Sequence, residues 1–592
     1  MVNSNRLKLL RRLWLHINPR RRVQFGLLFL VMMLSSFAEV VSIGAVIPFL
    51  GALTSPDSIF VHPIAQPMIH LLGLTEPEQL LLPLTIAFAV AALFSGGMRL
   101  LLLFVQTRLG YAIGADFSFS IYRRTLYQPY AMHLERNSSE VIAGITNKAN
   151  TVISNVLIPL ASITSSLLLL VSILLTLLAV EPVIAVSAFT GFGVIYAIVL
   201  IISKKAVARD SQRINYELGR LIKSLQEGLG GIRDVIIDGT QNIYCKIFRN
   251  SDLPLRRAQA NISIIANSPR FIIEALGMVL IAFLAFSLAR RSTGIVDAIP
   301  ILGVMALAAQ RLLPVLQQSY SNWTLIRGAQ EPLSAALDLL DQPLPEHANE
   351  SLKSLMPFNQ NITLTNLKFR YAKDAPWVFQ DGLNLNIAKG SRIGFIGTTG
   401  SGKSTLLDII MGLLQPTSGS LAIDGVNISE QNYRNWQAHI AHVPQAIFLG
   451  DTSIAENVAF CSPDEPIDYA RVRKACQKAQ ISETIESWDE QYNTLVGERG
   501  VRLSGGQRQR IGIARALYKD ADVIVFDEAT SALDNETEVA VMEAIENLGH
   551  ELTVIIVAHR LTTLKVCSHI VELEDGKIKQ SGSYGDIIAE PN

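Results

Sequence analysis

A glycine-rich segment beyond the middle of the chain has the residue types needed to hold phosphate groups. Gly397–Ser404 reads GTTGSGKS and matches the pattern GxxxxGK[ST]. It follows the apolar stretch Ile393–Ile396 and opens a helix-favouring sequence, which is the context that this pattern requires. Glycines let backbone N–H groups turn toward phosphate oxygens, and the start of a helix adds positive potential. We therefore predict a nucleotide-phosphate site; a glycine-rich turn without a ligand is the alternative, which the flanking elements disfavour.

The residues of this loop have separate predicted roles. Lys403 is expected to reach the β- and γ-phosphates of the nucleotide, and Ser404 to ligate Mg²⁺. The other predicted nucleotide-binding residues of the loop are Gly397, Thr398, Thr399, Gly400, Ser401, Gly402 and Thr405.

Two adjacent carboxylates follow a second apolar strand. Asp527 and Glu528 end the sequence ADVIVFDE, so both lie at the carboxyl end of the expected strand, where open α/β sheets bind their ligands. Asp527 is predicted to bind Mg²⁺ through water, and Glu528 to polarise the water that attacks the nucleotide. The alternative is that both acids are solvated and bind no ligand. The presence of the phosphate loop disfavours it.

The segment LSGGQ, Leu503 to Gln507, is a second candidate anion site. Ser504, Gly505, Gly506 and Gln507 can present a hydroxyl and backbone N–H groups at the start of a helix. One nucleotide has no need of two such sites on one chain, so a site on another subunit is expected to face this one.

Together these motifs resemble the nucleotide-binding domain of the ABC transporters, over essentially all of 361–592. The resemblance implies ATP and Mg²⁺ as cofactors and gives roles to four further residues. Tyr371 would stack on adenine. Gln445 would sense Mg²⁺ and the γ-phosphate, as a catalytic residue and metal ligand. His559 would be the catalytic switch histidine, and Asp534 would contact nucleotide as the D-loop residue.

The same resemblance implies a dimer. In this family two such domains close around two ATP molecules, and each ATP lies between the phosphate loop of one chain and the LSGGQ segment of the other. The motifs are intact, so a homodimer is expected to hydrolyse ATP at both sites, although pairing with a related half-transporter stays open.

The N-terminal part of the chain has the composition of a membrane protein. A helix needs about 20 apolar residues to cross a bilayer. Candidate spans fall at about 23–52, 79–105, 152–180, 183–203, 271–289 and 295–317. The basic N-terminus indicates that both chain ends are cytoplasmic. We predict a six-helix all-α transmembrane domain of the ABC exporter type over 1–340, a linker over 341–360 and an α/β P-loop nucleotide-binding domain over 361–592.

Polar segments between the spans carry further expectations. Residues 106–151 and 204–270 favour helix and are expected to extend the membrane helices into the cytoplasm, each pair joined by a short turn. The sequence HPIAQPMIHLLGL, between the first two spans, is expected to form a short amphipathic helix at the outer interface.

Three arginines on three predicted helices reach similar depths, roughly 24–28 Å from the outer end at 1.5 Å per residue. They are Arg99, Arg270 and Arg311. If they face inward, they form a cationic belt that would bind substrate, because arginine forks suit phosphate and pyrophosphate. The alternatives are pairing of Arg270 with Glu274 and snorkelling of all three to inner-leaflet phosphates.

The whole chain also resembles the bacterial flippases of lipid-linked oligosaccharides. The residues that carry this resemblance are PRFIIEALG (269–277), QRLLP (310–314), Arg99 and the amphipathic outer segment. It implies polyprenyl-pyrophosphate-linked sugars as cargo, membrane lipids as partners and the bacterial cytoplasmic membrane as location. The rival hypotheses are an exporter of peptides, drugs or unglycosylated lipids and a non-transporting ATP-gated regulator. The formal net charge of zero argues against nucleic acid as a partner.

Overall fold

The chain forms two compact units. The computed structural model describes residues 2–54, 56–63, 65–136, 142, 144–145, 149–180, 182–289, 295–349, 355–460, 466–528, 535–546, 551–558 and 560–588. The helical unit comprises Met1–Gln128 and Arg136–Leu344, and the α/β unit comprises Pro129–Glu135 and Pro345–Asn592.

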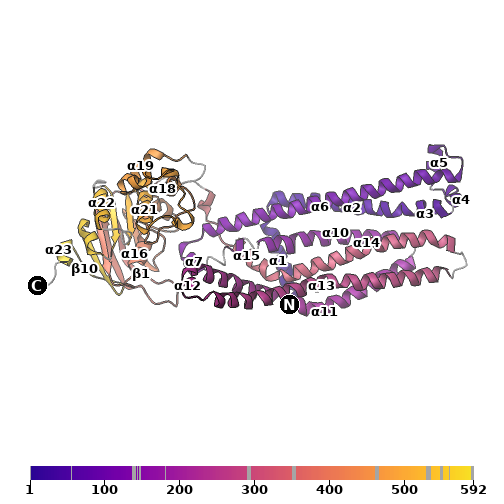
Figure 1. Ribbon diagram of the computed structural model, residues 1–592, viewed down its shortest axis with the longest axis horizontal. Helices are drawn as coiled ribbons and strands as arrows, with labels where there is room; N and C mark the ends of the chain where they lie inside the picture. The colour runs from indigo at the N-terminus through magenta and orange to yellow at the C-terminus, as the bar shows by residue number, and fades with distance from the viewer. Residues whose placement is uncertain are drawn as a thin grey trace. The chain divides into compact units, whose positions relative to one another are not determined.

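Long helices that run side by side build the helical unit (Figure 1). Its helices are α1 (Val2–His16), α2 (Pro19–Gly44), α3 (Val46–Thr54), α4 (Pro56–Phe60), α5 (Gln66–Leu72), η1 (Pro77–Leu80), α6 (Leu81–Leu126), α9 (Ala149–Val152), η3 (Ile153–Leu157), α10 (Ile158–Val180), α11 (Pro182–Gly230), α12 (Ile232–Ile237), α13 (Gln241–Ala289), α14 (Ile295–Gly328) and α15 (Gln330–Leu340).

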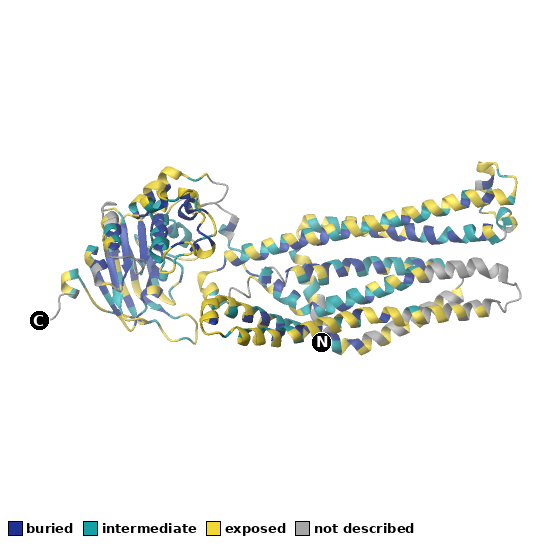
Figure 2. Ribbon diagram, in the orientation of Figure 1, coloured by how far each residue is buried: buried dark blue, intermediate teal, exposed yellow. Residues whose placement is uncertain are grey.

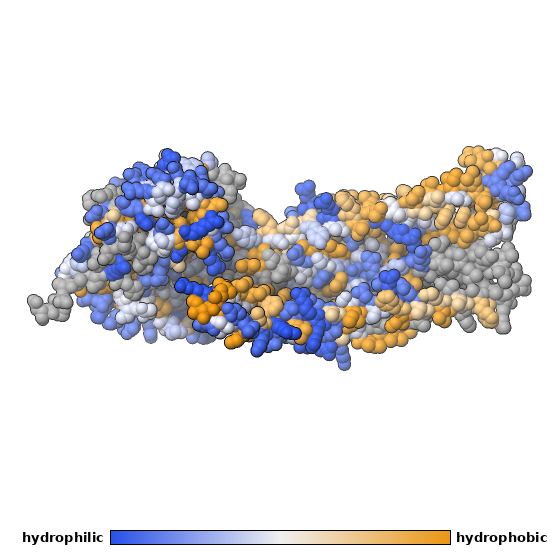
Figure 3. All heavy atoms as spheres, viewed as in Figure 1, coloured by the Kyte–Doolittle hydropathy of each residue, from blue (hydrophilic) through white to orange (hydrophobic). Residues whose placement is uncertain are grey.

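Among the described residues, three helical stretches are long and apolar enough to cross a membrane. They are Pro19–Thr54, Pro77–Leu126 and Ala149–Leu178. Large apolar side chains remain exposed along α2 and α6, and Figure 3 shows hydrophobic surface over these helices. Such a surface suits contact with lipid chains. The other three predicted spans lie within α11, α13 and α14, whose side chains are described only in part.

Several of these helices are much longer than a bilayer crossing requires. Helix α6 has 46 residues, and α11 and α13 have 49 each. At 1.5 Å per residue, each is about 70 Å long. The polar segments predicted to extend the spans are therefore helical over 106–126, 204–230 and 241–270, and between α11 and α13 the turn contains the short helix α12. Their cytoplasmic placement stays a prediction.

Two glycines bring α6 close to η3 and to the start of α10. A Cβ atom at Gly114 would lie 1.9 Å from Cδ1 of Ile153, and one at Gly110 would lie 2.7 Å from Cγ1 of Ile158. Both distances are below van der Waals contact, so the two isoleucines occupy space that only glycine leaves open. Small residues of this kind permit close helix packing in membrane proteins.

The predicted amphipathic segment forms the short helix α5. Its Ile69 is buried in a cluster with Ala52, Leu80 and Leu84, whereas Leu71 is exposed. The helix is therefore apolar on its packed side and also carries an exposed apolar residue, which suits a bilayer interface.

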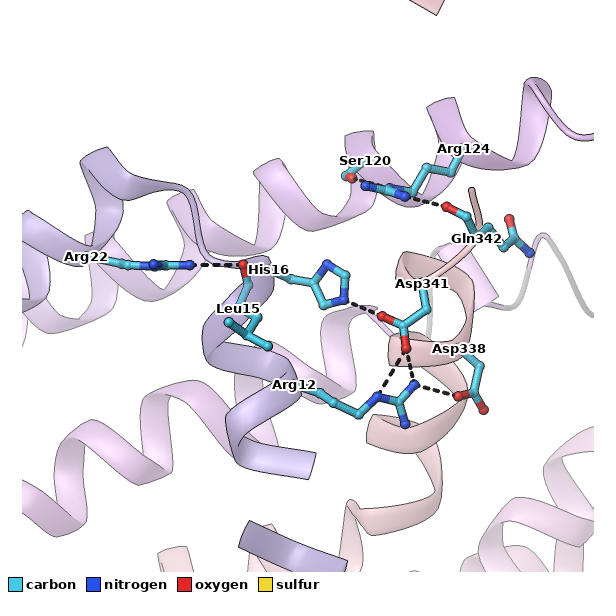
Figure 4. Close-up of polar contacts among 9 residues, drawn as sticks. All are labelled: Arg12, Leu15, His16, Arg22, Ser120, Arg124, Asp338, Asp341 and Gln342. Carbon is cyan, nitrogen blue, oxygen red and sulfur yellow. Dashed lines mark hydrogen bonds and ion pairs between the residues drawn. The ribbon is translucent and has the colours of Figure 1, made fainter. Parts of the chain in front are cut away.

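Ion pairs join α1 to α15 in the helical unit (Figure 4). The Arg12 guanidinium donates to Asp338 at 2.8 Å and, through Nε, to Asp341 at 3.1 Å. The ring of His16 contacts the other oxygen of Asp341 at 2.6 Å. On the α6 side, Arg124 donates to the backbone carbonyl of Gln342. The residues that follow α15 are therefore held against two other helices of this unit.

The α/β unit contains two sheets and several short helices. Its elements are α7 (Tyr130–Glu135), η4 (Glu346–Asn349), β1 (Asn361–Phe369), β2 (Phe379–Ala388), β3 (Arg392–Gly397), α16 (Lys403–Ile410), β4 (Ser418–Ile423), β5 (Val426–Asn427), α17 (Tyr433–Gln437), β6 (Ile440–Val443), α18 (Ile454–Ala459), α19 (Tyr469–Lys478), α20 (Ser482–Glu486), η5 (Gln491–Asn493), η6 (Glu498–Gly500), α21 (Gly505–Lys519), β7 (Val523–Asp527), α22 (Asn535–Glu546), β8 (Thr553–Val557), η7 (Leu561–Val566), β9 (His569–Glu574), β10 (Lys577–Gly582) and α23 (Tyr584–Ile588).

The larger sheet has the strand order β10-β9-β3-β8-β7-β6, and the smaller one β2-β1-β4-β5. In the larger sheet, β3 and β7 both pair in parallel with β8, and Phe395 and Asp527 both pair with Val557. The carboxyl ends of β3 and β7 therefore meet at one edge of the sheet. Burial of the apolar strand residues, dark blue in Figure 2, holds this edge in place.

Candidate functional site

The phosphate loop joins β3 to α16 and depends on glycine at two of its positions. Gly397 has φ of 147°, and a Cβ there would lie 2.1 Å from the carbonyl oxygen of Leu573. Gly402 has φ of 98°, and a Cβ there would lie 2.9 Å from the ring of Phe379. Side chains are excluded at both positions, so the loop backbone keeps positive φ values that glycine permits, and loops of this kind can direct N–H groups at a phosphate.

The polar groups of this loop fit a phosphate-bearing ligand. Lys403 donates from Nζ to the carbonyls of Gly397 at 2.8 Å and Thr398 at 2.9 Å, which places its cation inside the loop. The hydroxyl of Ser401 is buried and has no hydrogen-bond partner among the described residues. Thr398, Thr399, Gly400 and Ser404 are exposed. Burial lowers the pKa of Lys403, although the nearby Glu528 and Asp527 act in the opposite direction.

Glu528, which follows the last residue of β7, lies beside a glutamine from the loop after β6. Gln445 donates from Nε2 to Oε2 of Glu528 at 2.6 Å, so two predicted catalytic residues are in contact. Glu528 has φ of 50°, a left-handed conformation that is uncommon for glutamate. Burial raises the pKa of Asp527, Glu528 raises it further, and Lys403 lowers it.

The donor set at this edge also fits a divalent cation. Carboxylate, hydroxyl and amide oxygens are the hard ligands that Mg²⁺ prefers, and Asp527, Ser404 and Gln445 offer one of each. In the structure, Gln445 contacts Glu528. Strand β8 lies between β7, which ends in Asp527, and β3, which precedes the phosphate loop. Their role as metal ligands stays a prediction.

The predicted adenine-binding tyrosine is exposed beside the loop. The Tyr371 hydroxyl is hydrogen-bonded to Oγ1 of Thr405, with 2.9 Å between the oxygens, which joins two predicted nucleotide-binding residues. Its ring packs edge-on against Phe369, with the centroids 5.0 Å apart. Tyr371 is 47% exposed, so part of the residue is accessible to a planar ligand.

The LSGGQ segment begins helix α21 with a capping box. The Ser504 hydroxyl accepts from the N–H of Gln507 at 3.2 Å, and the Gln507 side chain accepts from the N–H of Ser504 at 2.8 Å. Gly505 and Gly506 occupy the first turn, where backbone N–H groups have no partner within the helix. This helix start can therefore bind an anion. The predicted residues His559 and Asp534 lie outside the described residues.

Two of the three predicted membrane arginines converge on one carboxylate. Arg311 of α14 lies 2.9 Å from Oε1 of Glu39, and Arg99 of α6 lies 3.6 Å from Oε2, each measured from Nε. Arg270 instead pairs with Glu274 of its own helix at 2.6 Å and is 54% exposed. The Arg270–Glu274 pair, which was the alternative to a substrate-binding role for Arg270, is therefore present in the structure. Arg99 and Arg311 instead share one partner, Glu39.

Glu39 is not among the residues predicted from the sequence. It is an acid within the first apolar span, and ionisable residues at membrane depth are costly enough to call for a function. That signal is present in the sequence, but the partners of Glu39 are not evident from it, because they lie on other helices far along the chain.

A cavity of about 860 Å³, lined by both apolar and polar side chains, lies within the helical unit, among α11, α13, α14 and α15. Amide and hydroxyl side chains line it, including those of Asn215, Gln259, Ser263 and Asn267. Asn267 is about one helical turn from Arg270 on α13. Groups of this kind can hydrogen-bond to neutral polar ligands such as sugars.

Comparison with known proteins places this arrangement in a family. Residues 380–531 match the family model described as ABC transporter. The chain is 31% identical over 403 residues to the ATP-dependent lipid A-core flippase of Alkalilimnicola ehrlichii, which covers 67% of each chain. It is 37% identical over 286 residues to the alpha-hemolysin translocation ATP-binding protein HlyB of Escherichia coli O6:H1, covering 48% of this chain and 40% of that protein.

The fold is also that of a solved exporter. The structure of a bacterial Atm1-family ABC exporter with ATP bound superposes with a TM-score of 0.78 over 97% of each chain, at 22% identity. The predicted fold class, a helical transmembrane domain followed by an α/β P-loop domain, is confirmed. With an ATP-binding domain of this type and these relatives, the chain belongs to the ABC transporter family and is an ATP-hydrolysing membrane translocase of the exporter type.

Proposed function

We propose that this exporter flips an anionic, lipid-linked glycan from the inner to the outer leaflet of the bacterial cytoplasmic membrane. The observation that carries the proposal is the meeting of Arg99 and Arg311 around one carboxylate in the membrane helices. Guanidinium forks bind phosphate and pyrophosphate bidentately, whereas a peptide or an uncharged drug does not require them.

The ATP site supplies the energy. Lys403 is held by the carbonyls of Gly397 and Thr398, and it would exchange these contacts for phosphate oxygens. Glu528 would accept a proton from the attacking water, and Gln445 would report the state of the site through the hydrogen bond that joins the two side chains. Mg²⁺ would neutralise charge on the phosphates, held by Ser404, Asp527 and Gln445.

A homodimer completes each site in this proposal. The capped start of α21 offers a second anion site, with Ser504, Gly505 and Gly506 exposing polar groups. ATP would lie between this helix start of one subunit and the phosphate loop of its partner. Closure on ATP and opening after hydrolysis would change the membrane helices, as differential binding of two states requires.

The amide and hydroxyl groups in the cavity and the known relatives both support a glycolipid cargo. A lipid-linked glycan needs a cationic group for its phosphate and neutral polar groups for its sugars, and the helical unit has both kinds. The relative named as a lipid A-core flippase matches two thirds of the chain, whereas the toxin translocation protein matches less than half. We place the polyprenyl-pyrophosphate class first because it combines a phosphorylated head with a sugar chain.

Flipping assays with the full-length protein in proteoliposomes test the proposal. A fluorescent polyprenyl-pyrophosphate oligosaccharide is expected to move in an ATP-dependent manner, and the same oligosaccharide on an uncharged lipid is not. Replacing Arg99 and Arg311 together by Ala is expected to lower flipping per ATP hydrolysed by at least about tenfold. Arg108→Ala, on α6 but outside the pair, is the matched control. Equal transport of the charged and uncharged lipids, or of a peptide alone, would refute the proposal.

A further inference from the structure

Glu39 lies at the centre of a charged cluster that joins three membrane helices. It belongs to α2, and its partners Arg99 and Arg311 belong to α6 and α14. The hydroxyl of Ser95, one turn before Arg99 on α6, also donates to Oε2 of Glu39. Ser95 is fully buried, so this hydroxyl has Glu39 rather than water as its acceptor.

The acidic side chain of this cluster is much less exposed to solvent than its two basic side chains. The Glu39 side chain is 1% exposed, whereas that of Arg99 is 42% and that of Arg311 is 31% exposed. The carboxylate is therefore covered, and the guanidinium groups form the accessible part. With two cations and one anion, the cluster has a formal charge of +1. It attracts anions while its own acid neutralises part of the positive charge.

A guanidinium group has five N–H donors, more than one carboxylate oxygen can occupy. Each arginine forms an ion pair with Glu39 from Nε, at 3.6 Å for Arg99 and 2.9 Å for Arg311, and can still offer donors to a second anion. A buried carboxylate without a cation would be costly, and so would two arginines without an anion. Glu39 therefore stabilises both arginines at membrane depth when no cargo is bound.

We propose that Glu39 is the internal counter-anion of the cargo site: it positions Arg99 and Arg311 and competes with the cargo phosphate for them. This inference rests on the proposed function, because it takes the pyrophosphate of a lipid-linked glycan as the competing anion. Competition weakens cargo binding and shortens its residence, since the arginines return to Glu39 when the phosphate leaves. Glu39 is a positioning residue that tunes release.

If Glu39 competes with the cargo phosphate, two substitutions are expected to shift the lipid concentration for half-maximal flipping in opposite directions. Glu39→Gln keeps the size of the side chain but raises the formal charge of the cluster to +2. The lipid concentration that gives half-maximal flipping is expected to fall by about tenfold, with a lower maximal rate because release slows. Ser95→Ala removes a donor from Glu39, so the carboxylate depends more on the arginines. The half-maximal concentration is then expected to rise.

The experiment measures flipping of a fluorescent polyprenyl-pyrophosphate oligosaccharide by the full-length protein across a range of lipid concentrations. Glu39→Asp retains the charge and is expected to restore a half-maximal concentration near that of the original protein. Glu217→Gln is the matched control, since Glu217 is also buried and paired with an arginine, Arg220, but belongs to α11. Thermal unfolding of each variant reports the folded fraction, and rates are scaled to it.

Opposite shifts for Glu39→Gln and Ser95→Ala, with rescue by Glu39→Asp, support the inference. An unchanged half-maximal concentration in both variants overturns it and assigns Glu39 a structural role only. If Glu39→Gln does not fold, the direction of the Ser95→Ala shift decides alone. Failure of the original protein to distinguish charged from uncharged lipid would instead refute the proposed function, so the two failures are separable.

Discussion

The side-chain amide of Gln445 donates a hydrogen bond of 2.6 Å to the carboxylate of Glu528. The contact joins β6, through the residues that follow it, to the end of β7, and these two strands are neighbours in the sheet. A general base is effective only when its carboxylate is oriented toward the attacking water. Gln445 is therefore placed to orient Glu528.

Replacing Glu528 by Gln is expected to lower ATP hydrolysis by at least about 100-fold, because the amide cannot accept the proton of the attacking water. ATP binding is expected to persist, since the phosphate loop is unchanged. Steady-state phosphate release and retention of labelled ATP are the measurements. Glu574→Gln, on β9 beside Lys579, is the control. Robust turnover by Glu528→Gln would show that another group is the base.

Asp408 gives the α/β unit a dependence on pH. Burial raises the pKa of this carboxyl from 3.8 to about 6, and the nearby Asp527 contributes in the same direction. The protonated form is favoured in the fold, so its stabilisation is complete below pH 3.8 and is lost as the pH rises through about 6.

Asp408→Asn replaces the titrating group by a neutral one of similar size. The variant is expected to lose less thermal stability than the original protein between pH 4 and pH 7, limits chosen to bracket the shifted pKa of about 6. Differential scanning calorimetry of the nucleotide-free protein at several pH values checks this. Parallel curves for the two proteins would contradict the assignment.

The ion pairs between α1 and α15 are expected to respond to acid in the opposite direction. Burial raises the pKa of Asp341, but hydrogen bonds from Arg12 and His16 outweigh it and leave the pKa below its ordinary value of 3.8. The stabilisation is therefore present above pH 3.8 and is lost as the pH falls through the lowered pKa.

Asp341→Asn is expected to lower the stability of the helical unit by about 1 kcal/mol or less at neutral pH, because the pair is partly exposed. The difference between variant and original is expected to shrink at high salt, which screens exposed charges. Thermal unfolding at low and high ionic strength is the measurement. A difference that does not change with salt would indicate packing rather than charge.

The close packing of α6 gives a test of the core of the helical unit. A Cβ at Gly114 would meet Ile153 at 1.9 Å, so Gly114→Ala is expected to cost about 1–3 kcal/mol by overpacking. A Cβ at Gly97, on the same helix, would have no atom within 4 Å, so Gly97→Ala is the matched control with a small effect. Detergent-solubilised thermal stability separates the two; equal effects would mean that Ile153 moves aside freely.

Much of the ATP site can be predicted from residues that are adjacent in the sequence. A phosphate loop is a continuous segment between a strand and a helix, so Gly397–Ser404 and its flanking elements are recognisable from residue order alone. Asp527 and Glu528 are recognisable in the same way, because they end an apolar strand. The sequence spacing also indicated Glu274, one turn along the helix, as a possible partner for Arg270, and the structure contains that pair.

The Glu39 cluster shows where residue order is insufficient. Glu39, Arg99 and Arg311 lie on helices separated by long stretches of chain, and helical periodicity tells which residues share a face but not which face meets which helix. The same holds for Arg12 and Asp341, which lie near opposite ends of the helical unit's sequence. Chemistry carried by contiguous residues follows from local geometry, whereas the pairing of distant charges depends on how long helices pack, and that is a property of the folded chain.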